Sequence, residues 1–175
     1  EGVSQLYLAG RGERSYFDIR SIYYTGYSEL DQQKQLPIIA PVLDYSKTLP
    51  EQVMGGELSY KMNITSLSRQ EASYDPISTA AIAQGICANG MAETADPALL
   101  TKSNCLLRGI PGDYSRASAE VDWKRTIITG DGQMFTPFFQ LRGDVASLNV
   151  DNQPGVANYI APGEHELSRI MPVAG

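Results

Sequence analysis

The chain has 175 residues, of which 42% are hydrophobic, and its 14 Lys and Arg residues against 20 Asp and Glu residues give a formal net charge of −6. An acidic balance without a basic stripe argues against a nucleic-acid-binding protein, and the hydrophobic fraction argues against disorder. The sequence contains no run of about eighteen apolar residues, which excludes a membrane-spanning helix, although the strands of a membrane barrel escape that test.

Alternation of polar and apolar residues predicts an all-β fold. It is clearest in 57–68, where Glu57 and Lys61 share one parity and Leu58 takes the other, as in a strand with one wet and one apolar face. The predicted strands span roughly 2–9, 15–27, 36–45, 57–68, 115–128, 135–150 and 165 to the end. We expect an antiparallel meander of about seven strands. The one candidate helix, at 77–84, is short.

The charged side chains of four predicted strands keep to one parity. In the strand at 15–27, for example, Asp18 and Arg20 alternate with Phe17 and Ile19. For any one of these residues the alternatives are a place in a solvated ladder of cross-strand ion pairs and a specific ligand contact. We interpret the polar parity as lumen-facing, which selects as candidate site residues Asp18, Arg20, Glu57, Lys61, Asn63, Arg116, Glu120, Asp122, Lys124, Gln140, Arg142 and Asp144.

The predicted links between strands alternate in length. The short links span 10–13, 47–56 and 129–133, and the longer links span 28–35, 70–113 and 151–164. Asp131 and Gly132 form the Asp-Gly pair of a tight hairpin. Outer-membrane barrels alternate short periplasmic turns with long extracellular loops, so this pattern and the long strands favour a large transmembrane β-barrel over a soluble sandwich.

Aromatic and proline residues mark the strand ends. The candidate aromatic girdles are Tyr23, Tyr24 and Tyr27 towards the long links and Tyr45, Trp123 and Phe135 towards the short ones. Ordinary sheet packing is the alternative for each aromatic residue. Because proline lacks a ladder donor, we expect bulges, weak pairing or strand ends at Pro37, Pro41 and Pro137.

No catalytic constellation is visible in the sequence. Glu120 and Asp122 share a face, but Arg116 and Lys124 flank them, and the single histidine, His165, has no paired nucleophile. We therefore predict that the protein is not an enzyme and that it has no metal site and no cofactor.

The only two cysteines, Cys87 and Cys105, both fall within the predicted long link at 70–113. In an oxidising compartment a local disulfide between them would close this link. Two unpaired thiols are the alternative.

Segments across nearly the whole chain resemble LptD, the lipopolysaccharide-assembly family of Gram-negative outer membranes. The likeness is strongest in LPIIAPVLDY at 36–45, SLSR at 66–69 and RIMP at 169–172. The resemblance implies a periplasmic jellyroll domain followed by a very large barrel of about 26 strands that is plugged by the lipoprotein LptE. It also implies that lipopolysaccharide passes from a periplasmic bridge that includes LptA into the outer leaflet.

The resemblance places the chain in the cell outer membrane. Residues 1–175 are expected to be a segment of the first half of the barrel domain of a longer mature protein, with a long extracellular loop at about 70–113 and short periplasmic turns. The implied partners are lipopolysaccharide, LptE, LptA through the jellyroll domain, and outer-membrane lipid, with no nucleic acid. Cys87 and Cys105 do not match the family's conserved disulfide cysteines, because both lie inside one predicted loop.

Two other functions are compatible with the same residues. A soluble periplasmic β-domain acting as a binding or structural module also alternates apolar and polar residues. A general porin or transporter barrel shares the strand pattern. Solubility without detergent separates the first from a barrel, and the conductance of the full-length protein separates the second.

Overall fold

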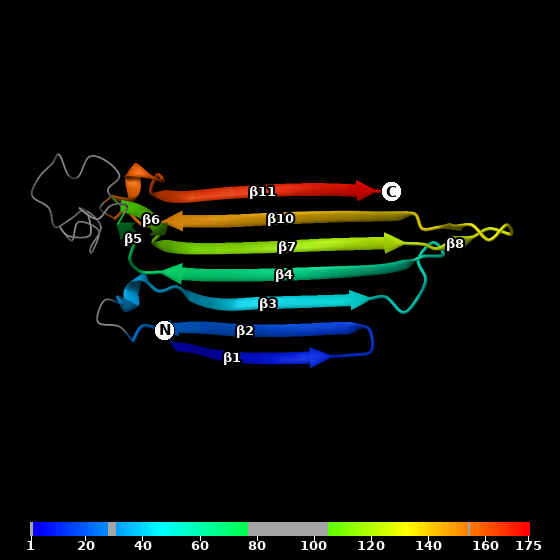
Figure 1. Ribbon diagram of the computed structural model, residues 1–175, viewed down its shortest axis with the longest axis horizontal. Coiled ribbons are helices and arrows are strands. Elements are labelled where there is room, and N and C mark those ends of the chain that lie inside the picture. Colours follow the sequence, from blue (N-terminus) through cyan, green and yellow to red (C-terminus); the bar gives the residue numbers. More distant parts are fainter. Residues whose placement is uncertain (1, 28–30, 77–104, 154) are drawn as a thin grey trace, which may run out of the picture.

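Seven long strands form one antiparallel sheet in the computed structural model, which describes residues 2–27, 31–76, 105–153 and 155–175. The strands pair in the order β1-β2-β3-β4-β7-β10-β11 (Figure 1). Their bounds are β1 Gly2–Arg11, β2 Ser15–Thr25, β3 Ile38–Thr48, β4 Glu57–Arg69, β7 Gly112–Lys124, β10 Phe138–Val150 and β11 Gly163–Ala174. The predicted all-β antiparallel meander is thereby confirmed. Within the described residues the sheet is open, because the outer edges of β1 and β11 have no partner strand.

The strands of this sheet are longer than those of most globular proteins. They contain 10 to 13 residues each, whereas ordinary strands average about five or six. A strand that crosses a bilayer at a tilt needs about 9 to 11 residues. The sheet is therefore long enough along its strands to span a membrane.

Two of the predicted strands are too long at the end where the short turns lie. The predicted strand at 115–128 is divided into β7 and a separate β8 (Ile127–Ile128). The predicted strand at 135–150 is divided into β9 (Met134–Phe135) and β10. Ile127 and Ile128, like Met134 and Phe135, are adjacent apolar residues, so the alternation stops where the long strands are broken.

β8 and β9 pair with each other in a hairpin that projects beyond the sheet (Figure 1). Gly132 at its turn has φ of 80°, a left-handed conformation that glycine adopts without steric cost, so the predicted tight turn is confirmed. The complete link at 125–137 is consequently no shorter than the link at 151–162. The strict alternation of short and long links is therefore wrong at this point.

The three links at the other end of the sheet pack into a structure that we call the cap. It comprises residues 31–37, 70–76, 105–111, 151–153 and 155–162. The Gln153 side chain joins two of these links, because it accepts from Ala72 N at 2.9 Å and donates to Gln70 O at 2.7 Å. The Lys34 ammonium group lies 3.2 Å from the Glu71 carboxylate and joins the third.

The cap contains short elements that the sequence does not predict. β5 (Ser73–Pro76) pairs with β6 (Cys105–Gly109) inside the range that was expected to be loop, and η1 (Gln33–Gln35) and η2 (Val156–Asn158) are single 3-10 turns. The candidate helix at 77–84 lies outside the described residues. Across the parts of the chain that the structure describes, no helix has the length and hydropathy needed to cross a membrane.

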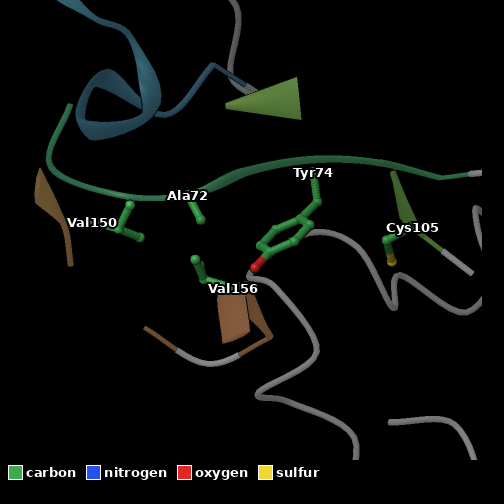
Figure 2. Close-up of a cluster of buried hydrophobic side chains, with 5 residues drawn as sticks. All are labelled: Ala72, Tyr74, Cys105, Val150 and Val156. Atoms are coloured by element: carbon green, nitrogen blue, oxygen red, sulfur yellow. The ribbon is translucent and has the colours of Figure 1, made fainter. Parts of the chain in front are cut away.

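The buried hydrophobic side chains of the described residues gather in and beside the cap. They are Ala72, Tyr74, Cys105, Val150 and Val156 (Figure 2). Val156 is completely buried, and Cys105 is 1% exposed. The Tyr159 hydroxyl donates a hydrogen bond to the Cys105 carbonyl and ties η2 to β6. The cap thus has a small apolar core of its own.

β3 contains a bulge at Ala40 and Pro41, which together stand opposite Ser66 alone. Proline lacks the N–H group that a continuous ladder needs, so the bulge expected at Pro41 is confirmed. Pro37 and Pro137 instead lie immediately before β3 and β10, where no ladder bond is lost.

Candidate functional site

Strand register gathers the charged residues of the sheet in rows on one face, which we call the polar face. The central row crosses six strands and consists of Asp18, Asp44, Asn63, Ser118, Asp144 and Arg169. The next row towards the β8–β9 hairpin consists of Tyr16, Ser46, Lys61, Glu120, Arg142 and Met171. Each residue stands directly opposite the next, at a distance where side chains interact.

Burial in this sheet is the reverse of that in water-soluble sheets. Asp18 and Asp144 on the polar face are each only 7% exposed. Large side chains on the opposite face are exposed, and they include Met62, Ile64, Val121, Leu141, Val145 and Ile170. A continuous apolar face of this kind is stable against hydrocarbon and unfavourable in water.

Asp144 in β10 accepts hydrogen bonds from four side chains. Arg116 Nη2 and Ser118 Oγ in β7 each lie 2.7 Å from its Oδ1. Arg169 Nη2 in β11 lies 2.9 Å from its Oδ2, and Arg142 Nη2 in β10 lies 3.3 Å from its Oδ1. Three guanidinium groups from three adjacent strands therefore share one carboxylate, whose side chain is 8% exposed.

Asp18 in β2 has fewer partners. The Tyr16 hydroxyl donates to its Oδ2 at 3.2 Å, and Arg20 Nε lies 3.5 Å from its Oδ1, which is buried and accepts no hydrogen bond from the described residues. Arg20 Nη2 donates instead to Asp44 Oδ2 at 2.9 Å, and Asp44 Oδ1 accepts from Asn63 Nδ2 at 2.6 Å. At this end of the row, two carboxylates share one guanidinium group.

Between these two clusters, Lys61 in β4 forms ion pairs with two acidic side chains of β7. Its Nζ donates to Glu120 Oε1 at 2.9 Å and to Asp122 Oδ2 at 3.2 Å. Beside them, Lys124 Nζ lies 3.1 Å from Glu57 Oε1. Because both Glu120 and Asp122 are bound to the same ammonium group, they form part of an ion-pair ladder.

All the polar residues selected from the sequence lie on this one face. Gln140, for example, stands opposite Asp122, and Arg116 stands opposite Thr65. The register brings Arg116, Arg142 and Asp144 into contact. That this face lines a lumen stays a prediction.

Sequence reasoning misses two charged members of the central row, Asp44 and Arg169. Asp44 follows the bulge at Pro41, which shifts the parity of β3, so counting from the start of the strand puts it on the wrong face. Pro41 is the signal from which it could have been found. Arg169 lies between Leu167 and Met171 on the same face of β11, so no polar pattern marks it.

The expected aromatic girdles form only in part. Trp123 lies at the end of the sheet near the short turns and Tyr23 near the cap. Tyr24 is on the polar face, Tyr45 lies opposite the middle of β4, and Phe135 lies in β9 outside the sheet. The period of two cannot tell an aromatic residue at a rim from one in mid-strand, because it does not fix where pairing begins.

A cavity of about 250 Å³ lies on the polar face between the two aspartate clusters. Residues that line it include Tyr16, Asp44, Lys61, Asn63, Glu120 and Arg142. Charged side chains of both signs stand around it, and Tyr45, Met62 and Ala119 also line it. In the described ranges, no group of three or more His, Cys, Asp or Glu side chains is placed to hold a metal ion.

In the cap, the Tyr74 and Tyr159 rings lie 6.4 Å apart between centroids. Burial raises the pKa of the Tyr74 hydroxyl, and Tyr159 raises it further. Cys105 lies beside them, but Cys87 lies outside the described residues, as do 77–104 of the predicted loop. The Cys87–Cys105 disulfide and the extracellular position of 70–113 therefore stay predictions.

Comparison with known proteins gives one match. A family model described as LptD, LPS transport system D, matches residues 1–175. No curated protein and no solved structure matches the chain.

Proposed function

The chain belongs to the LptD family of outer-membrane lipopolysaccharide transport proteins, and on this premise we propose that it is part of the translocon that inserts lipopolysaccharide into the outer leaflet. Residues 1–175 form a wall segment in the first half of the barrel domain. The segment takes part in the transport and assembly of lipopolysaccharide, and it catalyses no covalent step.

The reversed burial of the sheet carries this proposal. A wall whose apolar side chains face outward and whose aspartates are held in ion pairs on the other side suits a barrel with lipid outside and a polar lumen inside. Lipopolysaccharide has a charged sugar head and several acyl chains. The polar face offers the head a path on which its charged groups remain paired.

The two ends of the sheet fit the two sides of the membrane. The cap and the range 70–113 lie outside the cell, because the longest link, between β4 and β7, is at that end and outer-membrane barrels carry their long loops outside. The turns after β1 and β3 and the β8–β9 hairpin lie in the periplasm. LptE plugs the lumen that the polar face lines. LptA supplies lipopolysaccharide from the periplasmic side through the jellyroll domain.

Transport by the full-length protein tests this function. The protein with LptE is reconstituted in vesicles, lipopolysaccharide is supplied through the periplasmic bridge, and lipopolysaccharide that becomes accessible on the far side is measured. We expect accumulation that needs the complete barrel and the bridge. Far-side accumulation no greater than in protein-free vesicles would contradict the proposal.

Two control measurements address the alternative functions. Small-ion conductance of the plugged barrel should stay near the level of bare membrane, whereas a general porin conducts steadily. The barrel should also require detergent or lipid. A monodisperse full-length protein in water alone would favour the soluble β-domain.

A further inference from the structure

The cluster around Asp144 holds more positive charge than its own carboxylate neutralises. We propose that Arg116, Arg142 and Arg169 form a binding site for an oxyanion, a phosphate or carboxylate group carried by an amphiphile. That the amphiphile is lipopolysaccharide rests on the proposed function. The site itself rests on the charges and contacts of the cluster.

The charge surplus follows from the ion pairs. Three guanidinium groups surround the single charge of Asp144. A further acid, Glu120, reaches the cluster with its Oε2 3.6 Å from Arg142 Nη1, while its Oε1 already accepts from Lys61. The opposite end of the central row has the reverse balance, with two carboxylates for one guanidinium group. An anion on the polar face is therefore drawn towards β10 and β11.

The cluster also leaves the cations accessible and hides the acid. The side chains of Arg116, Arg142 and Arg169 are 35%, 38% and 52% exposed, against 8% for Asp144. The bonds to Asp144 use one nitrogen of Arg116 and two nitrogens each of Arg142 and Arg169. A guanidinium group has five N–H donors in a fork that matches the oxygens of phosphate and carboxylate. Donors therefore remain for a ligand above the buried acid.

The surroundings of Arg169 favour an amphiphile over a free ion. Leu167 and Met171 flank Arg169 on the same face of β11, and Leu167 is 71% exposed. Ala146, which stands between Arg116 and Leu167 in the adjacent row, presents only a methyl group. When the charged head of an amphiphile binds the arginines, its apolar portion can therefore pack along β11. A free phosphate ion has no apolar portion and gains nothing from this surface.

The test measures binding to the full-length protein in complex with its plug. The probes are bisphosphorylated lipid A, the same lipid A after enzymatic removal of its phosphates, and inorganic phosphate. The variant is Arg142→Gln together with Arg169→Gln. The control is Lys124→Gln, which removes one positive charge from the same face beside Glu57.

We expect the double variant to bind phosphorylated lipid A about tenfold more weakly, because charge-assisted hydrogen bonds to the anion are lost. Its binding of the dephosphorylated lipid and its folded fraction on unheated gels should not change. The control should shift binding by less than about twofold. Equal weakening for both lipids, or none for either, overturns the site.

Competition in the unaltered protein decides the same question if the double variant does not fold. Inorganic phosphate should displace phosphorylated lipid A better than chloride at equal ionic strength, and equal displacement overturns the site. Phosphate binding without any lipid binding overturns the assignment to an amphiphile. Lipid A binding that withstands the arginine substitutions overturns this inference alone, whereas failure of transport with intact binding contradicts only the proposed function.

Discussion

The sheet and the cap bury opposite kinds of side chain. The sheet buries Asp18 and Asp144 and leaves large apolar residues exposed, whereas the cap buries Val156 and Tyr74 in a small apolar core. A structure that meets water on all sides gains stability by hiding apolar surface, as the cap does. The sheet hides its charges, which is favourable when its other face meets lipid. One short chain therefore contains two regions with opposite patterns of burial.

The largest expected effect comes from placing a charge on the apolar face. Met62→Arg puts a cation at mid-strand on the exposed apolar side of β4, and it should cost roughly 2 to 4 kcal/mol of folding free energy in the membrane. Asn63→Arg, the adjacent residue on the polar face, should be tolerated because Asp44 stands opposite. Urea unfolding of the full-length protein in vesicles measures both. Equal losses would refute the assigned faces.

A smaller effect is expected from the core of the cap. Val156→Ala removes buried methyl groups, and it should destabilise the cap by about 2 kcal/mol. Because Val156 packs with Tyr74 and Val150 and the sheet is held by its own ladder, hydrogen exchange should quicken in β5 and β6 and not in β7. Ala157→Ser, at an exposed neighbouring position, is the control. Equal loss of protection in β7 would mean that sheet and cap unfold together.

The two buried aspartates of the sheet should differ in how much they contribute to stability. Asp144→Asn leaves three arginines without their shared counter-charge, whereas Asp18→Asn affects one. Both variants keep the side-chain volume and should lower the urea midpoint, and the decrease should be larger for Asp144→Asn. Water reaches the half-exposed arginines and limits the loss. A larger decrease for Asp18→Asn would show that the three arginines do not need Asp144 as a counter-charge.

The smallest effect concerns pH and the cap. Burial raises the pKa of Tyr74 above its unfolded value, so its stabilising contribution is complete below pH of about 10 and is lost as pH rises through the folded pKa. The difference between ultraviolet titrations of the unaltered protein and Tyr74→Phe isolates this tyrosine. A midpoint at or below the ordinary value of about 10 for an exposed tyrosine would show that the cap does not bury Tyr74.

Much of the sheet could be predicted from the sequence, because its strands obey a period of two. β4 and β7 contain no bulge, so Glu57, Lys61, Glu120 and Asp122 fall on the face that alternation assigns to them. Asp44 could not be assigned in this way, because the bulge at Pro41 precedes it and changes the parity of β3. The cap could not be predicted from the alternation either, because β5 and β6 are too short to show a period of two.

The sequence by itself determined the all-β class and the two unlike faces of the strands without a bulge, because successive side chains of a regular strand point to opposite faces. Only the tertiary structure decided which charges meet. Arg116, Arg142 and Arg169 come from three strands, and they surround Asp144 because β7, β10 and β11 pair in one particular register. Register depends on contacts between residues distant in the chain and on the geometry of the links, and neither is written in the alternation of a single strand.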